Sequence, residues 1–181
     1  MENMNNDLKP QIQKAQSPIS DLQLLITNYQ SHFASLRGLS LPIFLLALFA
    51  RLLPAERIID DAYITFRYAR NLIHGVGLVY NAGEYVLGTT TPLYALLMAT
   101  LALILRTENF PTIALWVNAL ADSLTCILLI ILGEKLSGDK RVGIAAALLF
   151  AIAPFSVTFA IGGMETSVFI LLITTTALLY L

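Results

Sequence analysis

Charged side chains are scarce in this chain of 181 residues, since only 13% are Asp, Glu, Lys or Arg while 57% are hydrophobic. A soluble domain carries about 25% charged residues. The net charge of −1 implies no nucleic-acid partner. Cysteine is nearly absent too: Cys126 is the only one and lies within an apolar run, which excludes a disulfide framework and a thiolate metal site. The composition therefore predicts an integral membrane protein.

The first 32 residues lack the pattern of a signal peptide, in which a short basic region stands directly before an apolar stretch. They begin as a polar segment rich in Asn and Gln. Further along, Asp21 can cap a helix whose apolar residues recur at helical spacing; these are Leu22, Leu25, Ile26, Tyr29, Phe33 and Leu36. We therefore expect residues 1–32 to be a cytoplasmic tail with an amphipathic helix on the membrane surface.

Long apolar runs over residues 33–181 predict an all-α fold, namely a polytopic transmembrane helical bundle. The expected spans are 33–53, 111–132, 142–161 and 167–181. Pro154 should kink the third of these. One further apolar segment, 92–105, would reach only about 21 Å, which is short of the ~30 Å hydrocarbon core.

The charge pattern predicts the topology by parity. Basic residues before the first span place the amino terminus in the cytoplasm, and the basic loop 133–141 should lie there as well. Three apolar segments stand between these two points, whereas a return to the same side needs an even number of crossings. We therefore expect 92–105 to lie at the outer interface without crossing. If it did cross, Glu165 would lie on the side opposite Asp60.

This topology makes 60–88 an external loop that starts with Asp60 and Asp61. An amphipathic helix is expected over 62–74. One carboxylate can act as a general base, and the other can orient an acceptor or hold a divalent cation. Arg67 and Arg70 could neutralise a phosphate leaving group. The alternative interpretation is that the acids only cap the helix and the arginines only contact lipid headgroups.

The string DDAYITFRYARNLIHGVGLVYNAGEYVLGTTTPL resembles the first external loop of GT-C superfamily glycosyltransferases, in particular the bacterial arabinofuranosyltransferase-like and mannosyltransferase-like branch. An acidic pair, an aromatic-Arg helix, a G-x-G-x-V/L-x-N turn and a G-E-x-V-x-G-x-T segment follow in order. The turn GGMET is similar to the second external loop, where the family often has another acid. The resemblance covers about residues 39–181, the amino-terminal part of such an enzyme.

The resemblance implies a helical bundle with two juxtamembrane helices, 62–74 and 92–105, in the first external loop. It also implies a catalytic base at Asp60 or Asp61, of which we favour Asp60. The expected substrate contacts are Tyr63, Arg67, Arg70, Glu84 and Glu165. Two departures matter: Leu87 stands where the branch often has an acid or bulky polar residue, and Glu165 stands where other branches commonly have Asp.

The predicted function is transfer of a sugar from a polyprenyl-phosphate donor to a glycan, lipid or protein acceptor on the outer side of the membrane. The expected location is the bacterial inner membrane, where the chain would contact lipid and further membrane chains. Family branches differ in metal dependence, so the resemblance leaves open whether the protein needs a divalent cation such as Mg²⁺ or Mn²⁺ as a cofactor. The alternative is a truncated, non-catalytic subunit or scaffold of a larger membrane complex.

Four polar or aromatic residues carry separate expectations. Arg51, near the end of the first span, is expected to extend to the interface. Asp122 lies inside a span and is either functional or paired with a neighbour such as Asn118 or with another helix. Tyr94 is expected to be an interface anchor. His74 is expected to interact with the helix carboxyl terminus rather than to transfer protons.

Overall fold

The protein is described by a computed structural model that covers residues 38–84, 86 and 88–181. The tail 1–32, its expected amphipathic helix, the start of the first predicted span and Leu87 lie outside the described residues. Residues Pro42–Leu181 form one compact unit. Within the described ranges every regular element is a helix, which confirms the all-α fold class.

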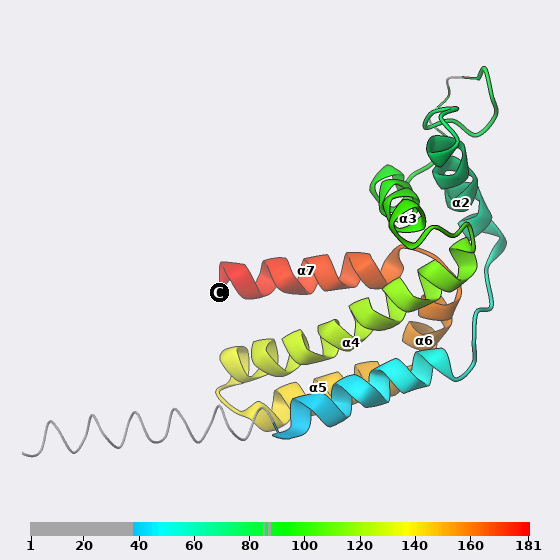
Figure 1. Cartoon of the computed structure of the whole chain (residues 1–181). Coiled ribbons are helices and arrows are strands. Elements are labelled where there is room, and N and C mark those ends of the chain that lie inside the picture. Colours follow the sequence, from blue (N-terminus) through cyan, green and yellow to red (C-terminus); the bar gives the residue numbers. More distant parts are fainter. Residues whose placement is uncertain (1–37, 85, 87) are drawn as a thin grey trace, which may run out of the picture. The chain divides into compact units, whose positions relative to one another are not determined.

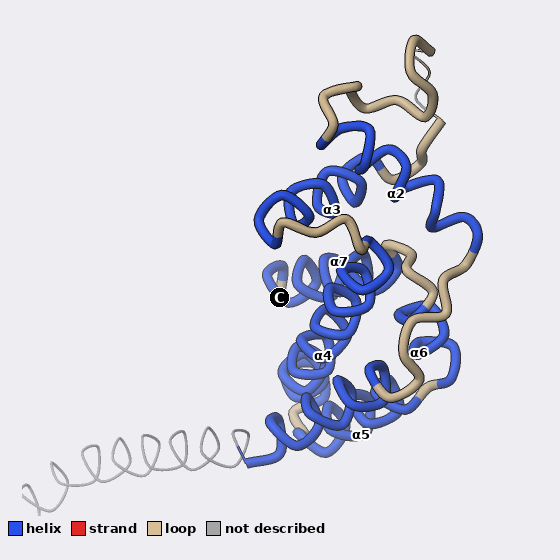
Figure 2. Tube along the Cα trace, turned by 45° about the vertical axis from the view of Figure 1, so that its right-hand side comes forward, coloured by secondary structure: helices blue, strands red, loops and turns tan. Residues whose placement is uncertain are grey.

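The helices follow the predicted order closely (Figure 1). After a first helix, Gly38–Leu52, the chain forms α2 (Asp60–Ile73), α3 (Pro92–Leu105), α4 (Phe110–Ser137), α5 (Lys140–Ile152), α6 (Pro154–Ile161) and α7 (Thr166–Tyr180). A long loop, tan in Figure 2, connects α2 to α3. The two helices expected within 60–105 therefore exist, and α2 starts two residues earlier than predicted.

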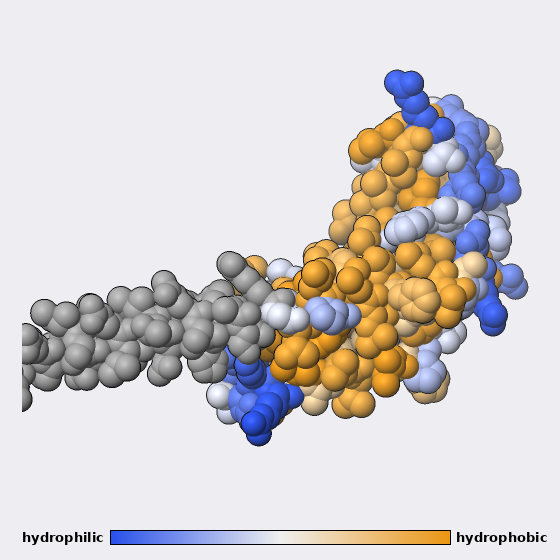
Figure 3. All heavy atoms as spheres, turned by 60° about the horizontal axis from the view of Figure 1, so that its bottom comes forward, coloured by the Kyte–Doolittle hydropathy of each residue, from blue (hydrophilic) through white to orange (hydrophobic). Residues whose placement is uncertain are grey.

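Of the described helices, α4 is the one long and apolar enough to cross a membrane by itself. The pair α5 and α6 passes the same test together and bends by 53° at its break, which confirms the kink expected at Pro154. The remaining apolar helices, Gly38–Leu52, α3 and α7, are shorter. Figure 3 shows one face that is apolar over its middle. Large apolar side chains such as Phe155 and Leu149 are exposed in the described part of the chain.

Helix α4 packs along α5 and α7 (Figure 1). Its contact with α5 is close because glycines face each other there: a Cβ added at Gly133 would collide with the backbone of Gly143. Small residues at such crossings let helix backbones approach. Gly133 was predicted to open the basic loop, but α4 continues to Ser137 and ends at Gly138, whose φ of 73° is left-handed. The loop is thus shorter than predicted.

The expectation that Arg51 reaches the interface is wrong, because Arg51 is 0% exposed. Its Nε donates to Asp122 Oδ2 over 2.7 Å, and its other nitrogens donate to Ser156 Oγ and to carbonyl oxygens that include that of Ala151. The ion pair therefore joins the first helix to α4 and to the α5–α6 break. Of the two interpretations of Asp122, pairing with another helix is confirmed.

Candidate functional site at the start of α2

Two backbone hydrogen bonds join the segment before α2 to the end of α6 and the turn that follows it. Arg57 N–H donates to Ile161 O and Ile59 N–H donates to Gly162 O, both over 3.0 Å. Asp60 and Asp61 follow directly as the first residues of α2. The acidic pair is therefore held beside the turn 162–165, although about a hundred residues separate the two in sequence.

Two glycines make this approach sterically feasible. A Cβ at Gly162 would lie 2.7 Å from Ile59 Cδ1, and one at Gly163 would lie 3.0 Å from Ile58 Cδ1 and 3.2 Å from Phe66 Cζ. Gly163 also has a φ of 81°, which side-chain-bearing residues rarely adopt. The GGMET turn therefore has glycines because it packs directly on α2.

Asp60 and Asp61 are exposed and lie in the first turn of α2. The N-cap residue is Ile59, and no side chain makes a capping hydrogen bond there, so the alternative that one of the acids caps the helix is wrong. Within the described part of the chain neither carboxylate has a hydrogen bond or ion-pair partner. Both are therefore available to a ligand.

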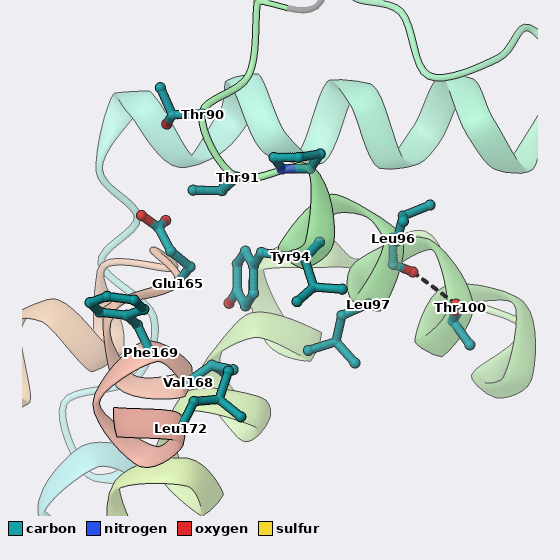
Figure 4. A pocket seen from close by; sticks show the side chains of 12 residues that line it. Thr90, Thr91, Tyr94, Leu96, Leu97, Thr100, Glu165, Val168, Phe169 and Leu172 are labelled. Atoms are coloured by element: carbon teal, nitrogen blue, oxygen red, sulfur yellow. Dashed lines mark hydrogen bonds between the residues drawn. The ribbon is translucent and has the colours of Figure 1, made fainter. Parts of the chain in front are cut away.

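Glu165 occupies the N-cap position of α7 in a helical conformation, with φ of −70° and ψ of −6°, and its side chain makes no capping bond. It is partly buried. Its carboxylate lies at one end of a cavity of about 550 Å³ between α3 and α7 (Figure 4). The hydroxyl-bearing Thr90 and Thr91 lie at the same end. The acid expected from the second loop thus faces a cavity.

Tyr94 and Asn118 connect the wall of this cavity to the turn. Tyr94 is only 4% exposed, so its expected role as an interface anchor is wrong. Its hydroxyl donates to Asn118 Oδ1 over 3.2 Å, and Asn118 Nδ2 donates to Ala160 O and Met164 O over 3.1 and 2.8 Å. Burial raises the pKa of Tyr94; the Asn118 contact lowers this pKa and the Glu165 charge raises it further. Tyr94 therefore stays a neutral donor.

Arg67 holds the loop after α2. Its guanidinium donates to Tyr80 O over 2.8 Å and to Asn81 Oδ1 over 3.3 Å, and lies 4.7 Å from the centre of the Tyr80 ring. These partners are neutral, so Arg67 has no acidic partner among the described residues. Glu84 lies in the same loop, where Asn81 Nδ2 donates to Glu84 Oε2 over 3.0 Å.

Arg70 and His74 share one acidic partner. Arg70 Nε lies 3.4 Å from Glu108 Oε2, and His74 Nε2 lies 2.7 Å from Glu108 Oε1. The hydrogen bond with His74 and the nearby charges of His74 and Arg70 lower the pKa of Glu108 against the opposing effect of burial. Arg70 thus has a charge partner that the sequence did not indicate, which leaves Arg67 as the stronger of the two candidates for a phosphate.

Two further candidates show no pairing partner in the described residues. Tyr63 lies in the first turn of α2 and is 53% exposed. Its ring contacts that of Phe66 edge to face. The exposed side chain of Arg57, which sequence reasoning missed, makes no hydrogen bond or ion pair there. Its only sequence signal is its position three residues before Asp60.

A divalent cation needs several oxygen ligands that converge. Among residues 38–84, 86 and 88–181, no three His, Cys, Asp or Glu side chains are grouped to hold one. Asp60 and Asp61 supply two carboxylates on successive positions of a helix, whose side chains point about 100° apart. Among the described residues the two acids therefore form no cation site with three or more such ligands.

Comparisons with protein-family models, with curated proteins and with solved structures give no match for this chain. The class of protein therefore has to be argued from the site. Its described features are two adjacent exposed carboxylates at the start of α2, Asp60 and Asp61, that bind no other described side chain. The partly buried Glu165 lies in the turn next to the segment that precedes them, and it lines an apolar cavity.

Proposed function

We propose that the chain provides the catalytic base of a multi-pass membrane glycosyltransferase that uses a polyprenyl-phosphate sugar. The observation that carries the proposal is the pairing of segment 57–59 with Ile161 and Gly162. It brings Asp60 and Asp61 beside the turn that bears Glu165, and Glu165 lines an apolar cavity. A lipid substrate and a base would meet at such a place.

In the proposed reaction, Asp60 accepts the proton of an acceptor hydroxyl group. The hydroxyl oxygen then attacks the anomeric carbon of the donor sugar and forms the new glycosidic bond. The bond from that carbon to the phosphate oxygen breaks, and the electron pair leaves with polyprenyl phosphate. Attack from the face opposite the leaving group inverts the anomeric configuration. Asp61 assists by orienting the acceptor.

The leaving phosphate needs a cation, because its charge increases as the bond breaks. Arg67 is an exposed guanidinium without an acidic partner in the described residues. Arg70 contributes less, since Glu108 already lies 3.4 Å from it. Tyr63, one helical turn ahead of Arg67 on α2, offers an exposed ring on which a sugar can stack.

The test is sugar transfer by the full-length gene product in membranes, with a radiolabelled polyprenyl-phosphate sugar. We expect an Asp60→Asn, Asp61→Asn double variant to lose about 10²–10⁴-fold in rate, the usual contribution of a general base. Asp139→Asn is the matched control. Asp139 caps α5 through Arg141 N–H, and Asn caps equally well, so the control removes one charge and should keep full activity.

Unchanged transfer in the double variant would reject the catalytic role of the pair. A different function would then be favoured if the wild-type chain co-purified stably with a larger membrane complex and bound no donor. That result would identify a non-catalytic subunit, with the turn at 162–165 serving only to fasten α6 and α7 to α2.

A further inference from the structure

The cavity between α3 and α7 has one charged end and a long apolar wall (Figure 4). Leu96, Leu97, Val168 and Leu172 are among the apolar residues that line the wall. Of the described residues that line the cavity, only Glu165 carries a charge. A volume of about 550 Å³ falls within the range of small-molecule sites, about 300–1,000 Å³. The occupant that fits is an amphiphile whose head lies at Glu165.

Glu165 decides the chemistry of that head group. An ionised carboxylate only accepts hydrogen bonds, and the Glu165 side chain makes none with the described residues. It would repel a phosphate but would accept hydrogen bonds from hydroxyl groups. The hydroxyl group of Thr90 at the same end can donate or accept, whereas that of Thr91 lies 3.3 Å from Thr65 Oγ1. A neutral polyhydroxylated head therefore complements this end.

Helix amino termini can bind anions, and α3 begins at this end of the cavity. Its backbone donors are largely engaged, however. Thr91 O accepts hydrogen bonds from Tyr94 N–H and Ala95 N–H, Thr91 N–H donates to Thr89 Oγ1, and Pro92 has no N–H. The start of α3 therefore offers few donors to a phosphate, and the charge of Glu165 dominates.

We infer that the cavity binds the lipid acceptor, an amphiphile with an apolar chain and a neutral head rich in hydroxyl groups, and does not bind the phosphate-linked donor. The acceptor role rests on the proposed function: a head group bound at Glu165 would have its hydroxyl groups beside the 162–165 turn, which pairs with the segment before Asp60. The binding itself does not depend on catalysis.

The experiment uses the full-length protein in nanodiscs of phosphatidylcholine and phosphatidylglycerol. Two photoactivatable probes share one dodecyl chain that carries a diazirine, and they differ only in the head: a β-glucoside or a phosphate. Mass spectrometry locates the cross-linked peptides, and competition with unlabelled dodecyl glucoside gives relative affinities. We expect the glucoside to label the segments 90–100 and 165–172 in preference to the phosphate.

Three variants separate specific binding from general contact with lipid. Glu165→Gln should weaken glucoside binding about tenfold, the usual effect of losing hydrogen bonds to a charged group, and should reduce the discrimination against phosphate. Leu172→Trp should fill the apolar wall and abolish labelling. Leu179→Trp is the matched control, because Leu179 lies on the same helix, is 82% exposed and does not line the cavity; it should label as wild type.

Equal or stronger labelling by the phosphate probe would overturn the inference, as would labelling that Leu172→Trp leaves unchanged. Absence of any labelling in 90–100 and 165–172 would also overturn it, since another part of the protein would then cover the cavity. The Asp60→Asn, Asp61→Asn variant keeps the two proposals apart. It is measured for transfer only, so unimpaired transfer in that variant would reject the base, whereas the binding result is taken from wild type, Glu165→Gln, Leu172→Trp and Leu179→Trp.

Discussion

At the scale of single residues, Arg51 connects three separate segments of the chain. Its guanidinium pairs with Asp122 and donates to Ser156 Oγ and to carbonyl oxygens of Ala47, Phe150 and Ala151. The last two carbonyls end α5, where Pro154 prevents the helix from continuing and so leaves acceptors without helical donors. Arg51 thus acts as a carboxyl-terminal cap for α5 as well as an ion-pair partner.

Replacing one partner of this buried pair should be costly. We expect Arg51→Met to lower the free energy of unfolding by about 3–5 kcal/mol, since the Asp122 carboxylate would remain buried without a counter-charge. Asp122 Oδ1 already has no hydrogen-bond partner among the described atoms, and the neutral hydroxyl of Ser156, 3.3 Å from Oδ2, would not replace the lost charge. Unfolding by denaturant in detergent micelles, followed by circular dichroism, measures the loss.

Arg57→Met is the control for this prediction, because Arg57 is exposed and has no side-chain partner in the described residues; its effect should stay within about 0.5 kcal/mol. A double variant, Arg51→Met with Asp122→Leu, should regain most of the lost stability because no charge is then buried alone. Equal stabilities of Arg51→Met and Arg57→Met would show that the ion pair does not contribute.

At the scale of elements, the junction between α2 and the α6–α7 turn positions the candidate site. Gly163→Ala should weaken this junction in two ways. A side chain at φ of 81° costs about 1–2 kcal/mol, and crowding against Ile58 and Phe66 should add about 1–3 kcal/mol. Sugar transfer should fall as well, because the pairing that positions Asp60 depends on the turn.

Gly75→Ala separates the two effects. Gly75 has a φ of 75°, close to that of Gly163, but a Cβ there would meet nothing within 4 Å. It should therefore show the backbone cost without the crowding and leave transfer unchanged. Chemical unfolding and the transfer assay are measured on both variants, and equal losses in both would mean that close packing at Gly163 has no role.

Local sequence signals predicted the elements well and their junctions poorly. Helices near 62–74 and 92–105 could be predicted because glycines and Pro92 delimit them and because α2 is amphipathic. The buried position of Arg51 could not, since an arginine near the end of an apolar helix has the same local sequence whether it faces a lipid headgroup or an aspartate on another helix.

The candidate site shows the same limit. The acidic start of α2 and the acid of the GGMET turn could be recognised as residues, whereas the bonds of Arg57 and Ile59 to Ile161 and Gly162 are long-range backbone contacts without a local signal. The Glu108 partner of Arg70 and the cavity beside Glu165 likewise depend on how helices pack. Parity predicted that the acids lie on one side of the membrane, but it could not predict which segments pair.

At the scale of the whole molecule, the proposed function requires that Asp60, Glu84 and Glu165 lie on one side of the membrane. The backbone pairing of 57–59 with 161–162 supports this, because the two ends it joins cannot lie across a bilayer from each other. In the proposed topology the segment 92–105 lies at the interface, because a crossing there would put Glu84 and Glu165 on opposite sides of the membrane.

Cysteine accessibility tests this topology in intact cells. In a Cys126→Ala background, single cysteines replace Glu84, Glu165 or Ser137, and a membrane-impermeant maleimide is added before or after permeabilisation. Glu84→Cys and Glu165→Cys should react from outside, whereas Ser137→Cys, near the basic residues that follow α4, should react only after permeabilisation. Labelling of Glu84→Cys and Glu165→Cys from opposite sides would mean that α3 crosses the membrane, and the acids could then not share one site.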